Sequence, residues 1–376
     1  MEITEKLLDT AKLLNRFIVP RYITGELISF AEEEGILKIL SELKSFSLDE
    51  INRTLEARKE YRLDEPVRKK MMADIISLLY ECGYLNRNGN IYSSSGGAYG
   101  ELRDELGLTD EERTILSDCF HSQTSFIKKC LDYAPEFLRG SPPLYSFDGD
   151  SLDIWDSFLG NIEFSFARQL LLLNLKIKNI SDFKFLDIGY GPGHGIISAR
   201  ELYPAIDITA VDFAGSFTSL VKEKTDAVLQ SEKLKDNIAM PVKLIANSAW
   251  NGFGHPLPFP DDSFDAVFFT CADPYIAPDL REYVYGEIYR ILRRGGSLGI
   301  LTRAYPDAEF KYVKNHWTRR AVYCHDFAES VCEGWHGFYD VEESFRLFRK
   351  IGFSKNKNTA GEICMLDSAI WRLDKD

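Results

Sequence analysis

The sequence lacks several features that would place it in a membrane, secreted or metal-binding class. It has no uninterrupted apolar run of about 18 residues, the length of a membrane-spanning helix, and no basic segment followed by an apolar one at its start. Its seven cysteines are scattered and include no C-x-x-C pair, which fits reduced thiols and offers no zinc-ligand pattern. We therefore expect a cytoplasmic protein with no bound metal and no membrane partner.

A surplus of positive charge is also absent. The 376 residues include 45 Lys and Arg against 58 Asp and Glu, which gives a net charge of −13. Binding to nucleic acid requires clustered Lys and Arg, so a polyanionic partner is not expected and a small-molecule substrate is favoured. The chain is longer than one typical domain of about 100–200 residues, so two domains are expected.

What the sequence does contain is a glycine-rich turn between a predicted strand and a predicted helix. Residues 185–195 read Phe-Leu-Asp-Ile-Gly-Tyr-Gly-Pro-Gly-His-Gly. Gly189, Gly191 and Gly193 let the backbone approach a ligand where a Cβ would collide, and the first helical amides would face a nucleotide-like cofactor. The dinucleotide fingerprint G-x-G-x-x-G requires a glycine where this chain has His194, so that fingerprint is excluded.

The spacing of the turn, which starts at Asp187 and reads D-x-G-x-G-x-G, resembles motif I of the class I S-adenosyl-L-methionine (SAM)-dependent methyltransferases. Asp212 ends a predicted strand 19 positions beyond Gly193, where a carboxylate can accept hydrogen bonds from ribose hydroxyls. Residues 258–269 look like the family's "LPFPDxSFDAV" segment, and residues 288–301 resemble its helix, glycine turn and fifth strand. The resemblance implies an α/β fold with a Rossmann-like doubly wound sheet.

The same resemblance assigns residues to the cofactor. The glycine turn would pass under the methionine part of SAM, Asp187 would anchor its amino end, Asp212 would hold the ribose and Phe213 would lie against the adenine. Ser248 stands where the family often has an acidic residue at the adenine rim, and its hydroxyl can still accept a hydrogen bond. The other predicted cofactor-binding residues are Gly189, Gly191, Gly193, Ala249, Trp250 and Cys271. Packing in the core is the alternative role of Phe213 and Trp250.

The first 100 residues follow a different, mainly helical pattern. Apolar spacing predicts helices over 22–44 and 67–84, a capping signature at 47–51 begins another, and Asn88-Gly89 between apolar pairs predicts a hairpin. Three helices and a hairpin make a winged-helix unit. Such a unit can bind DNA, which leaves open a ligand-sensing regulator, although residues 1–100 hold 14 Lys and Arg against 16 Asp and Glu.

In the small-molecule O-methyltransferases of natural-product type, which the chain resembles, this N-terminal unit is the dimerisation domain. The resemblance implies a winged-helix dimerisation domain over 1–100, a helical connector that contributes to the substrate pocket over 101–180, and a SAM-binding domain over 181–376. A homodimer through the N-terminal domain is therefore expected.

The acceptor side departs from the resembled enzymes, which use a histidine after the fourth strand to deprotonate a hydroxyl. Residues 270–276 contain no histidine, and Asp273 is the nearest carboxylate that could act as the base, with a loop cap as its alternative role. The long segment 303–340 carries His325 and His336, either of which could replace the missing base, unless the segment is a plain helical cover.

The sequence thus predicts SAM-dependent methyl transfer to a hydroxyl of a small organic metabolite. Carbon or nitrogen methylation, or a SAM-binding homologue with a non-methylating reaction, are the alternatives that the missing histidine keeps open. Cys271, Cys324 and Cys332 also allow a thiol nucleophile or a thiophilic acceptor, although free cysteines are more often small buried residues.

Overall fold

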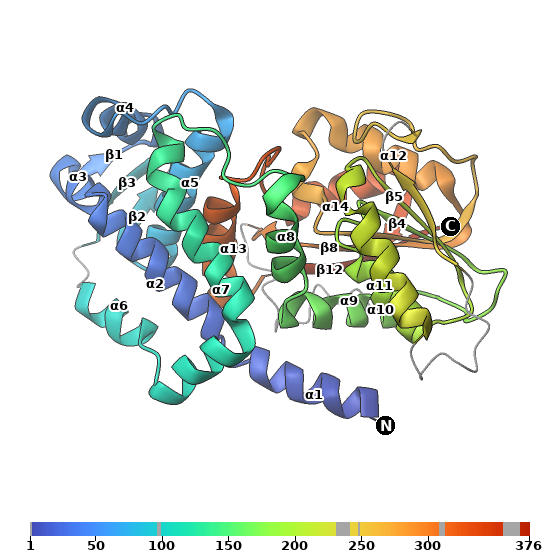
Figure 1. The fold of residues 1–376 in the computed structure, drawn as a ribbon. Helices are drawn as coiled ribbons and strands as arrows, with labels where there is room; N and C mark the ends of the chain where they lie inside the picture. The colour runs from blue at the N-terminus through green and yellow to red at the C-terminus, as the bar shows by residue number, and fades with distance from the viewer. Residues whose placement is uncertain (1, 96–98, 231–240, 247–248, 308–312, 356–368) are drawn as a thin grey trace. The chain divides into compact units, whose positions relative to one another are not determined.

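The computed structural model shows a chain that divides into two compact units (Figure 1). The structure describes residues 2–95, 99–230, 241–246, 249–307, 313–355 and 369–376. Unit 1 comprises Met1–Ser146 and Val313–Gly337, and unit 2 comprises Phe147–Tyr312 and Phe338–Asp376. The predicted boundaries at residues 100 and 180 differ from this division, because the helices of the predicted connector are shared between the two units.

Unit 1 is mainly helical. The predicted hairpin at Asn88-Gly89 is confirmed, because β2 and β3 pair antiparallel and Gly89 has a φ of 59°. The predicted cap is also confirmed, since the side chain of Ser47 accepts a hydrogen bond from the Glu50 amide at 3.2 Å. The winged-helix assignment stays a prediction. The elements before residue 146 are α1 (Glu2–Leu14), α2 (Ile18–Glu33), α3 (Ile36–Leu43), β1 (Ser45–Phe46), α4 (Leu48–Lys59), α5 (Pro66–Glu81), β2 (Leu85–Asn88), β3 (Ile91–Ser94), α6 (Tyr99–Leu106) and α7 (Asp110–Leu138).

Helix α13 (His316–Glu329) lies between strands of unit 2 in the sequence but packs inside unit 1. It contacts α2, α5 and α7, and its Phe327 is fully buried. Asp326, which is also fully buried, accepts hydrogen bonds from Lys70 of α5 and from Trp335 Nε1, the latter at 2.8 Å. Burial of a carboxylate without a partner would lower the stability of the fold. The helix is therefore held in the orientation in which Asp326 meets Lys70 and Trp335. The helix predicted as a possible cover at 303–340 is therefore part of the core of unit 1.

Unit 2 is built on a mixed sheet. Its main strands are β4 (Lys184–Ile188), β5 (Asp207–Asp212), β6 (Lys243–Ala246), β7 (Phe264–Thr270), β8 (Leu292–Thr302), β11 (Phe353–Lys355) and β12 (Ala369–Lys375). Within the described residues they form a seven-stranded sheet in the order β11-β12-β8-β7-β4-β5-β6. Strands β4 to β8 pair in parallel, and β12 pairs antiparallel with both β8 and β11. The predicted doubly wound α/β fold is confirmed.

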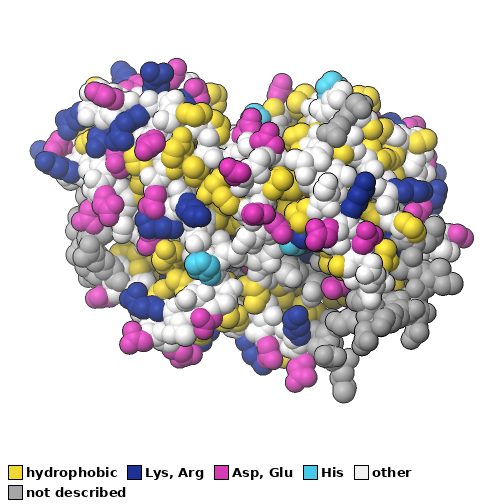
Figure 2. Space-filling view, in the orientation of Figure 1, with side chains coloured by type: hydrophobic (Ala, Val, Ile, Leu, Met, Phe, Trp, Pro, Cys, Tyr) yellow, Lys and Arg dark blue, Asp and Glu magenta, His cyan; other side chains and the backbone are white. Residues whose placement is uncertain are grey.

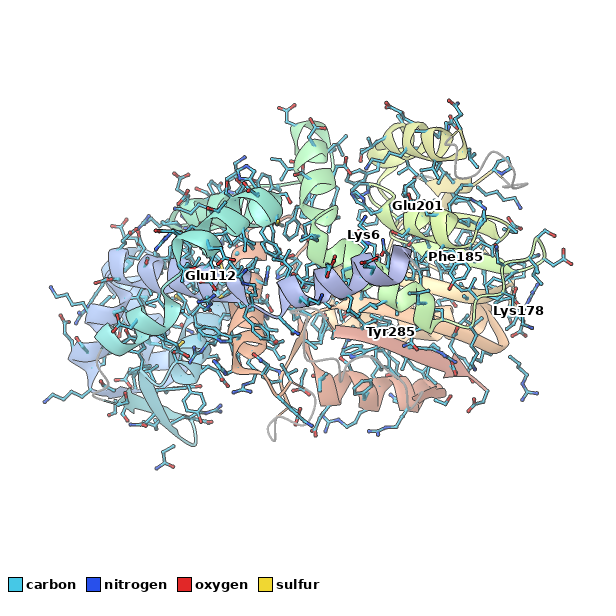
Figure 3. The ribbon with its side chains drawn as sticks, turned by 90° about the horizontal axis from the view of Figure 1, so that it is seen from below. Lys6, Glu112, Lys178, Phe185, Glu201 and Tyr285 are labelled. Carbon is cyan, nitrogen blue, oxygen red and sulfur yellow. The ribbon has the colours of Figure 1, made fainter. Side chains whose placement is uncertain are left out.

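Helices cover both faces of this sheet. They are α9 (Ile162–Asn174), α10 (His194–Leu202), α11 (Thr218–Gln230), α12 (Arg281–Ile291) and α14 (Val341–Ile351). Helix α8 (Leu152–Leu159) packs beside them, where its Asp156 pairs with His194 of α10 and Lys224 of α11. On one side α9 contacts α10, which contacts α11, and on the other α12 contacts α14 (Figure 1). Phe185 of β4 and Tyr285 of α12 are fully buried, whereas Lys178 and Glu201 are exposed (Figure 3). Consecutive residues of β4 and β5 are buried, so the helices cover both faces of these strands.

The chain order in the sheet reverses at β4, which lies between β5 and β7. In doubly wound sheets, ligands bind outside the carboxyl ends of the strands at such a reversal. The carboxyl end of β4 leads directly into the glycine-rich turn at 189–193. The topology therefore puts the predicted cofactor turn at the position where this fold binds ligands.

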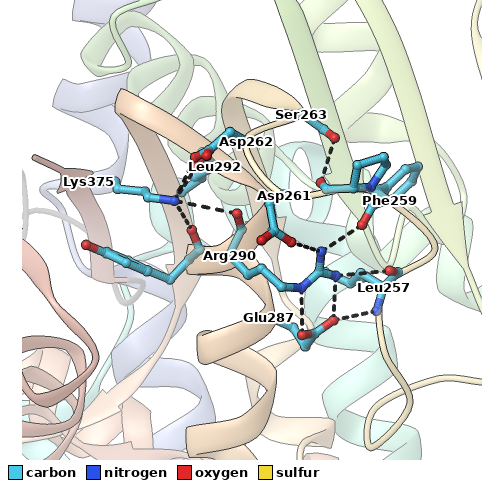
Figure 4. A network of polar contacts seen from close by, with 11 residues as sticks. Leu257, Phe259, Asp261, Asp262, Ser263, Glu287, Arg290, Leu292 and Lys375 are labelled. Atoms are coloured by element: carbon cyan, nitrogen blue, oxygen red, sulfur yellow. Dashed lines mark hydrogen bonds and ion pairs between the residues drawn. The ribbon is translucent and has the colours of Figure 1, made fainter.

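A polar network ties the segment that leads into β7 to helix α12 (Figure 4). Arg290 donates from Nη1 to the Phe259 carbonyl at 2.8 Å, and from Nε and Nη2 to Glu287 at 2.8 and 2.7 Å. Glu287 also accepts a hydrogen bond from the Leu257 amide at 2.9 Å. The hydrogen bonds to Glu287 raise the pKa of Arg290 and lower that of Glu287, so both stay charged at neutral pH.

We expect Arg290→Met to lower the free energy of unfolding by about 2–3 kcal/mol, because it removes several charge-assisted hydrogen bonds. Arg290→Lys should recover only part of the loss, since an ammonium group cannot reproduce the bidentate contact with Glu287. Urea denaturation followed by circular dichroism measures both. Arg346→Met, at an exposed position of α14, is the control, and an equal effect of Arg290→Met and Arg346→Met would contradict the role of the network.

Candidate functional site

The turn after β4 has a backbone that only glycine adopts without strain. Gly189, Gly191 and Gly193 have φ values of 69°, 45° and 83°. A Cβ on Gly193 would lie 2.9 Å from the side chain of Val221, and a Cβ on Gly189 would lie 3.2 Å from that of Ala272. The glycines that sequence reasoning selected for ligand approach are therefore also required by the turn itself.

Asp212 lies at the end of β5, where the sequence predicted it, and is 4% exposed. Its two oxygens accept hydrogen bonds from the backbone amides of Gly191 and Ala214, both at 2.8 Å. Burial raises the pKa of Asp212 to about 6, and the backbone hydrogen bonds oppose this effect. The carboxylate thus joins the glycine turn to the loop after β5.

Asp187 is more deeply buried and differently placed. Its side chain is 1% exposed, and neither oxygen accepts a hydrogen bond from a described residue. A Cβ on Gly195, in the first turn of α10, would lie 2.4 Å from Oδ2, so the carboxylate is packed directly against that turn. Burial raises the pKa of Asp187 to about 8. A buried carboxyl group without a partner is a feature that a bound cation or donor would satisfy.

Arg168 is a charged neighbour that sequence reasoning missed. It lies on α9, is 3% exposed, and donates from Nη1 to the Leu159 carbonyl at 2.7 Å, while its Nε finds no acceptor among the described residues. The positive charge of Arg168 lowers the pKa of Asp187, although burial outweighs it. The available signal was a single arginine within the mainly apolar run of residues 162–174.

An aromatic cluster adjoins the same edge of the sheet. The ring of Phe147 stacks on Trp155 with centroids 5.6 Å apart, and it meets Phe213 and Tyr275 edge to face at 5.7 and 5.1 Å. Its carbonyl accepts a hydrogen bond from Ser216 Oγ at 2.5 Å. Phe147 therefore bridges the loop after β5 and the loop after β7, which flank the β4 turn. The side chain of Phe213 remains 37% exposed and accessible to a ligand.

Comparison with known proteins identifies the domain. The family model described as "Methyltransferase domain" matches residues 185–296, from β4 into the beginning of β8. These residues form a methyltransferase domain. SAM is accordingly its cofactor. The residues present fit that molecule, because three of the five turn residues are glycines, Asp187 accepts no hydrogen bond from a described residue and Asp212 is hydrogen-bonded to the turn.

Relatives of known activity match part of their length. The chain is 28% identical over 187 residues to the sterol 24-C-methyltransferase erg-4 of Neurospora crassa, which covers 50% of this chain and 44% of that protein. It is 30% identical over 120 residues to the demethylmenaquinone methyltransferase of Deinococcus radiodurans, which covers 31% and 42%. The chain thus spans less than half the length of either relative.

The fold as a whole has solved counterparts. The DszA carbon methyltransferase matches with a TM-score of 0.61 and 12% sequence identity, over 98% of this chain and 93% of that chain. At this identity the likeness shows the fold alone, and the acceptor must be argued from the site.

The remaining predicted cofactor residues of the methyltransferase domain have different surroundings. Trp250 is 4% exposed and belongs to the hydrophobic core, where it packs on Phe253. These surroundings agree with packing in the core, the alternative role given for Trp250 from the sequence. Ala249 is exposed, and Ser248 lies outside the described residues. Cys271 follows β7 with a φ of 59°, a strained conformation for a residue with a Cβ, and its amide donates to the Leu301 carbonyl at 2.7 Å.

Asp273, the predicted base, is committed to a buried network within the methyltransferase unit. It is 1% exposed and accepts hydrogen bonds from Arg281 Nη2 at 3.2 and 3.3 Å and from the Tyr285 hydroxyl at 2.5 Å. The guanidinium of Arg281 also lies 3.6 Å from the centroid of the Tyr339 ring and donates to Ser344. These contacts leave Asp273 little capacity to take a proton from a substrate and give it a positioning role for the turn after β7.

The two candidate histidines lie outside the unit that carries the methyltransferase domain. His325 is fully buried on α13 of unit 1, with Nδ1 3.3 Å from Glu329 Oε1, and His336 is an exposed residue of the same unit. Cys324 and Cys332 are also buried in unit 1, whereas Cys271 is in unit 2. Their chemical roles stay predictions. In the described ranges of the chain, no group of three or more His, Cys, Asp and Glu side chains could hold a metal ion.

We expect Asp187→Asn to flatten the pH dependence of stability of the cofactor-free protein. The folded pKa of about 8 lies above the unfolded value of about 3.9, so the stability contributed by the proton is complete below about pH 4 and is lost as the pH rises through 8. Between about pH 5 and pH 8, the unfolding free energy of the wild type should fall by about 2–4 kcal/mol more than that of Asp187→Asn.

Urea denaturation at both pH values measures this difference. Asp226→Asn, which replaces an exposed carboxylate on α11, is the matched control and should keep the pH dependence of the wild type. Identical pH dependence in Asp187→Asn and the wild type would show that Asp187 is ionised in the folded protein.

We expect Asp273→Ala to lower the free energy of unfolding by about 3–5 kcal/mol, because it leaves the charge of Arg281 buried without its partner. The double variant Asp273→Ala/Arg281→Met should recover part of this loss, since it removes both charges. Thermal and urea denaturation test the two variants. A folded Asp273→Ala protein of unchanged stability that has lost only methyl transfer would instead identify Asp273 as the base.

Proposed function

We propose that the chain is a SAM-dependent methyltransferase that adds the methyl group to a carbon atom of a small, apolar acceptor. The observation that carries the proposal is the composition of the segments that flank the β4 turn: they present aromatic rings, and the carboxylate that follows β7 most closely, Asp273, is already hydrogen-bonded within the protein. Residues 270–276, after β7, contain one carboxylate, and Arg281 and Tyr285 already occupy it.

The aromatic cluster favours an apolar acceptor. Phe147, Trp155, Phe213 and Tyr275 come together from three separate segments of unit 2, and aromatic rings bind flat apolar molecules through large contact areas. The two relatives reported above are named for a sterol and for demethylmenaquinone, both of them apolar lipids, and the name of the first specifies transfer to carbon. These relatives support carbon methylation more than the hydroxyl acceptor that the sequence predicted.

Methyl transfer from a sulfonium to carbon determines what the residues of the site must do. Bound SAM supplies a methyl group on a sulfonium, and the acceptor carbon forms a bond to that methyl in line with the bond that breaks to sulfur, whose electron pair stays on sulfur. The residues around the turn must therefore orient the donor, and the aromatic cluster must exclude water and hold the acceptor. An acidic acceptor, such as a phenol or a 1,3-dicarbonyl compound, gives up its proton to water, and the resulting phenolate or enolate attacks through carbon. The ring proton that a phenol loses on returning to aromaticity also passes to water, so the step needs no strongly basic side chain.

Other expectations have less support. O-methylation by the resembled route requires a histidine that residues 270–276 lack. A DNA-binding regulator requires a basic surface, and on the face of unit 1 that Figure 2 shows, acidic side chains are interspersed among the basic ones. No helix of the described chain is long and apolar enough to span a membrane. A homodimer through the N-terminal domain and a cytoplasmic location are expectations that rest on the sequence.

The test compares two acceptors of the same ring system in the presence of SAM that carries a 13C-labelled methyl group. One is an alkylated hydroquinone with a free ring carbon, and the other has that carbon blocked but keeps its hydroxyls. We expect a carbon-bound methyl signal in the 13C NMR spectrum from the first acceptor alone. Asp212→Ala, checked for folding by circular dichroism, should abolish the signal. An oxygen-bound methyl on either acceptor would contradict carbon methylation.

A further inference from the structure

We propose that Arg168 anchors the carboxylate of the aminoacyl end of SAM, while Asp187 receives the ammonium group of the same end. Arg168 would thereby make the site selective for cofactors that carry an intact amino acid. The inference rests on the SAM-binding part of the proposed function and adds a specificity-determining residue to it.

The hydrogen bonds of Arg168 use only part of its donor capacity. A guanidinium has five N–H donors in a fixed fork, and burial makes each unsatisfied donor costly. Arg168 is 3% exposed, bonds to the Leu159 carbonyl through Nη1, and has a buried Nε with no acceptor among the described residues. The side chain therefore lies in the interior with donor capacity to spare.

A group of opposite charge, the carboxylate of Asp187, is close to Arg168. Asp187 is buried with both oxygens unpartnered in the described structure, and it is close enough to Arg168 for the two charges to influence each other. No ion pair joins them, although both are described residues. An amino acid presents an ammonium and a carboxylate a short distance apart, so one zwitterion satisfies both side chains at once.

The other buried arginine of this region is already paired. The guanidinium of Arg303 lies 5.0 Å from the centroid of the Phe164 ring, and that of Arg168 lies 5.8 Å from the same centroid. Arg303 Nη2 donates to Glu163 Oε2 at 3.3 Å, and both of these side chains are buried. Of the two arginines beside this ring, Arg168 forms no ion pair with a carboxylate of the described chain.

The experiment measures binding of two ligands by calorimetry. S-adenosylhomocysteine carries the aminoacyl end, and 5′-methylthioadenosine has the same nucleoside without it. We expect Arg168→Met to weaken binding of S-adenosylhomocysteine about 10- to 100-fold, the value of a lost charge-assisted hydrogen bond, and to change binding of methylthioadenosine by less than about 2-fold. Arg168→Lys should give an intermediate loss, because it keeps the charge but not the fork.

The matched control is Arg200→Met. Arg200 is an equally buried arginine of the same unit that donates to the carbonyls of Pro204 and Ile206, so its loss should affect both ligands alike. An equal loss for both ligands in Arg168→Met and Arg168→Lys, or no loss in either variant, would overturn the assignment of Arg168 while leaving the methyltransferase proposal intact. Wild-type protein that binds neither ligand would overturn both.

Discussion

The carboxyl group of Asp187 is held in the interior of unit 2 without a hydrogen-bond donor from the described chain, and the parts of the site are arranged around this constraint. The first turn of α10 passes so close to Oδ2 that residue 195 has no room for a Cβ. The turn that follows Asp187 in the sequence has positive φ values at its three glycines, and Cys271, after β7, has a positive φ that is strained for a residue with a Cβ. A buried carboxyl group without a donor and a strained backbone both lower the stability of the folded protein. Features of this kind are typical of ligand-binding sites, where contacts with the ligand offset the lost stability.

The glycine turn and the acidic end of β5 in unit 2, and the hairpin in unit 1, were predictable because their signals are local. A glycine turn, an acidic strand end and a hairpin each depend on a few consecutive residues, and Gly189 to Gly193, Asp212 and Asn88-Gly89 lie where the sequence indicated. Arg168 could not be predicted in this way. A single arginine in an apolar helix becomes a candidate site residue only when the folded structure shows that the carboxylate of Asp187 lies near it. The aromatic cluster depends likewise on three segments far apart in the chain.

The acceptor half depends on contacts that position in the sequence does not show. Asp273 stands where a base was expected, and helix α12 supplies Arg281 and Tyr285, whose side chains donate hydrogen bonds to its carboxylate. The sequence contained both partners, yet no short-range rule links them to residue 273. In the same way, the segment 303–340, for which the sequence left open a substitute base or a plain helical cover, contributes its helix α13 to unit 1.

The path of the chain has a consequence for biosynthesis. Helix α13 belongs to unit 1 although residues 147–312 of unit 2 precede it, and β12, at residues 369–375, lies between β8 and β11 in the sheet. During translation, the helices before residue 146 cannot complete their packing until α13 is made, and β8 cannot pair with β12 until about 70 residues later. Unit 1 therefore reaches its final packing only after most of unit 2 has been synthesised, which lengthens the period in which chaperones would find exposed apolar surface.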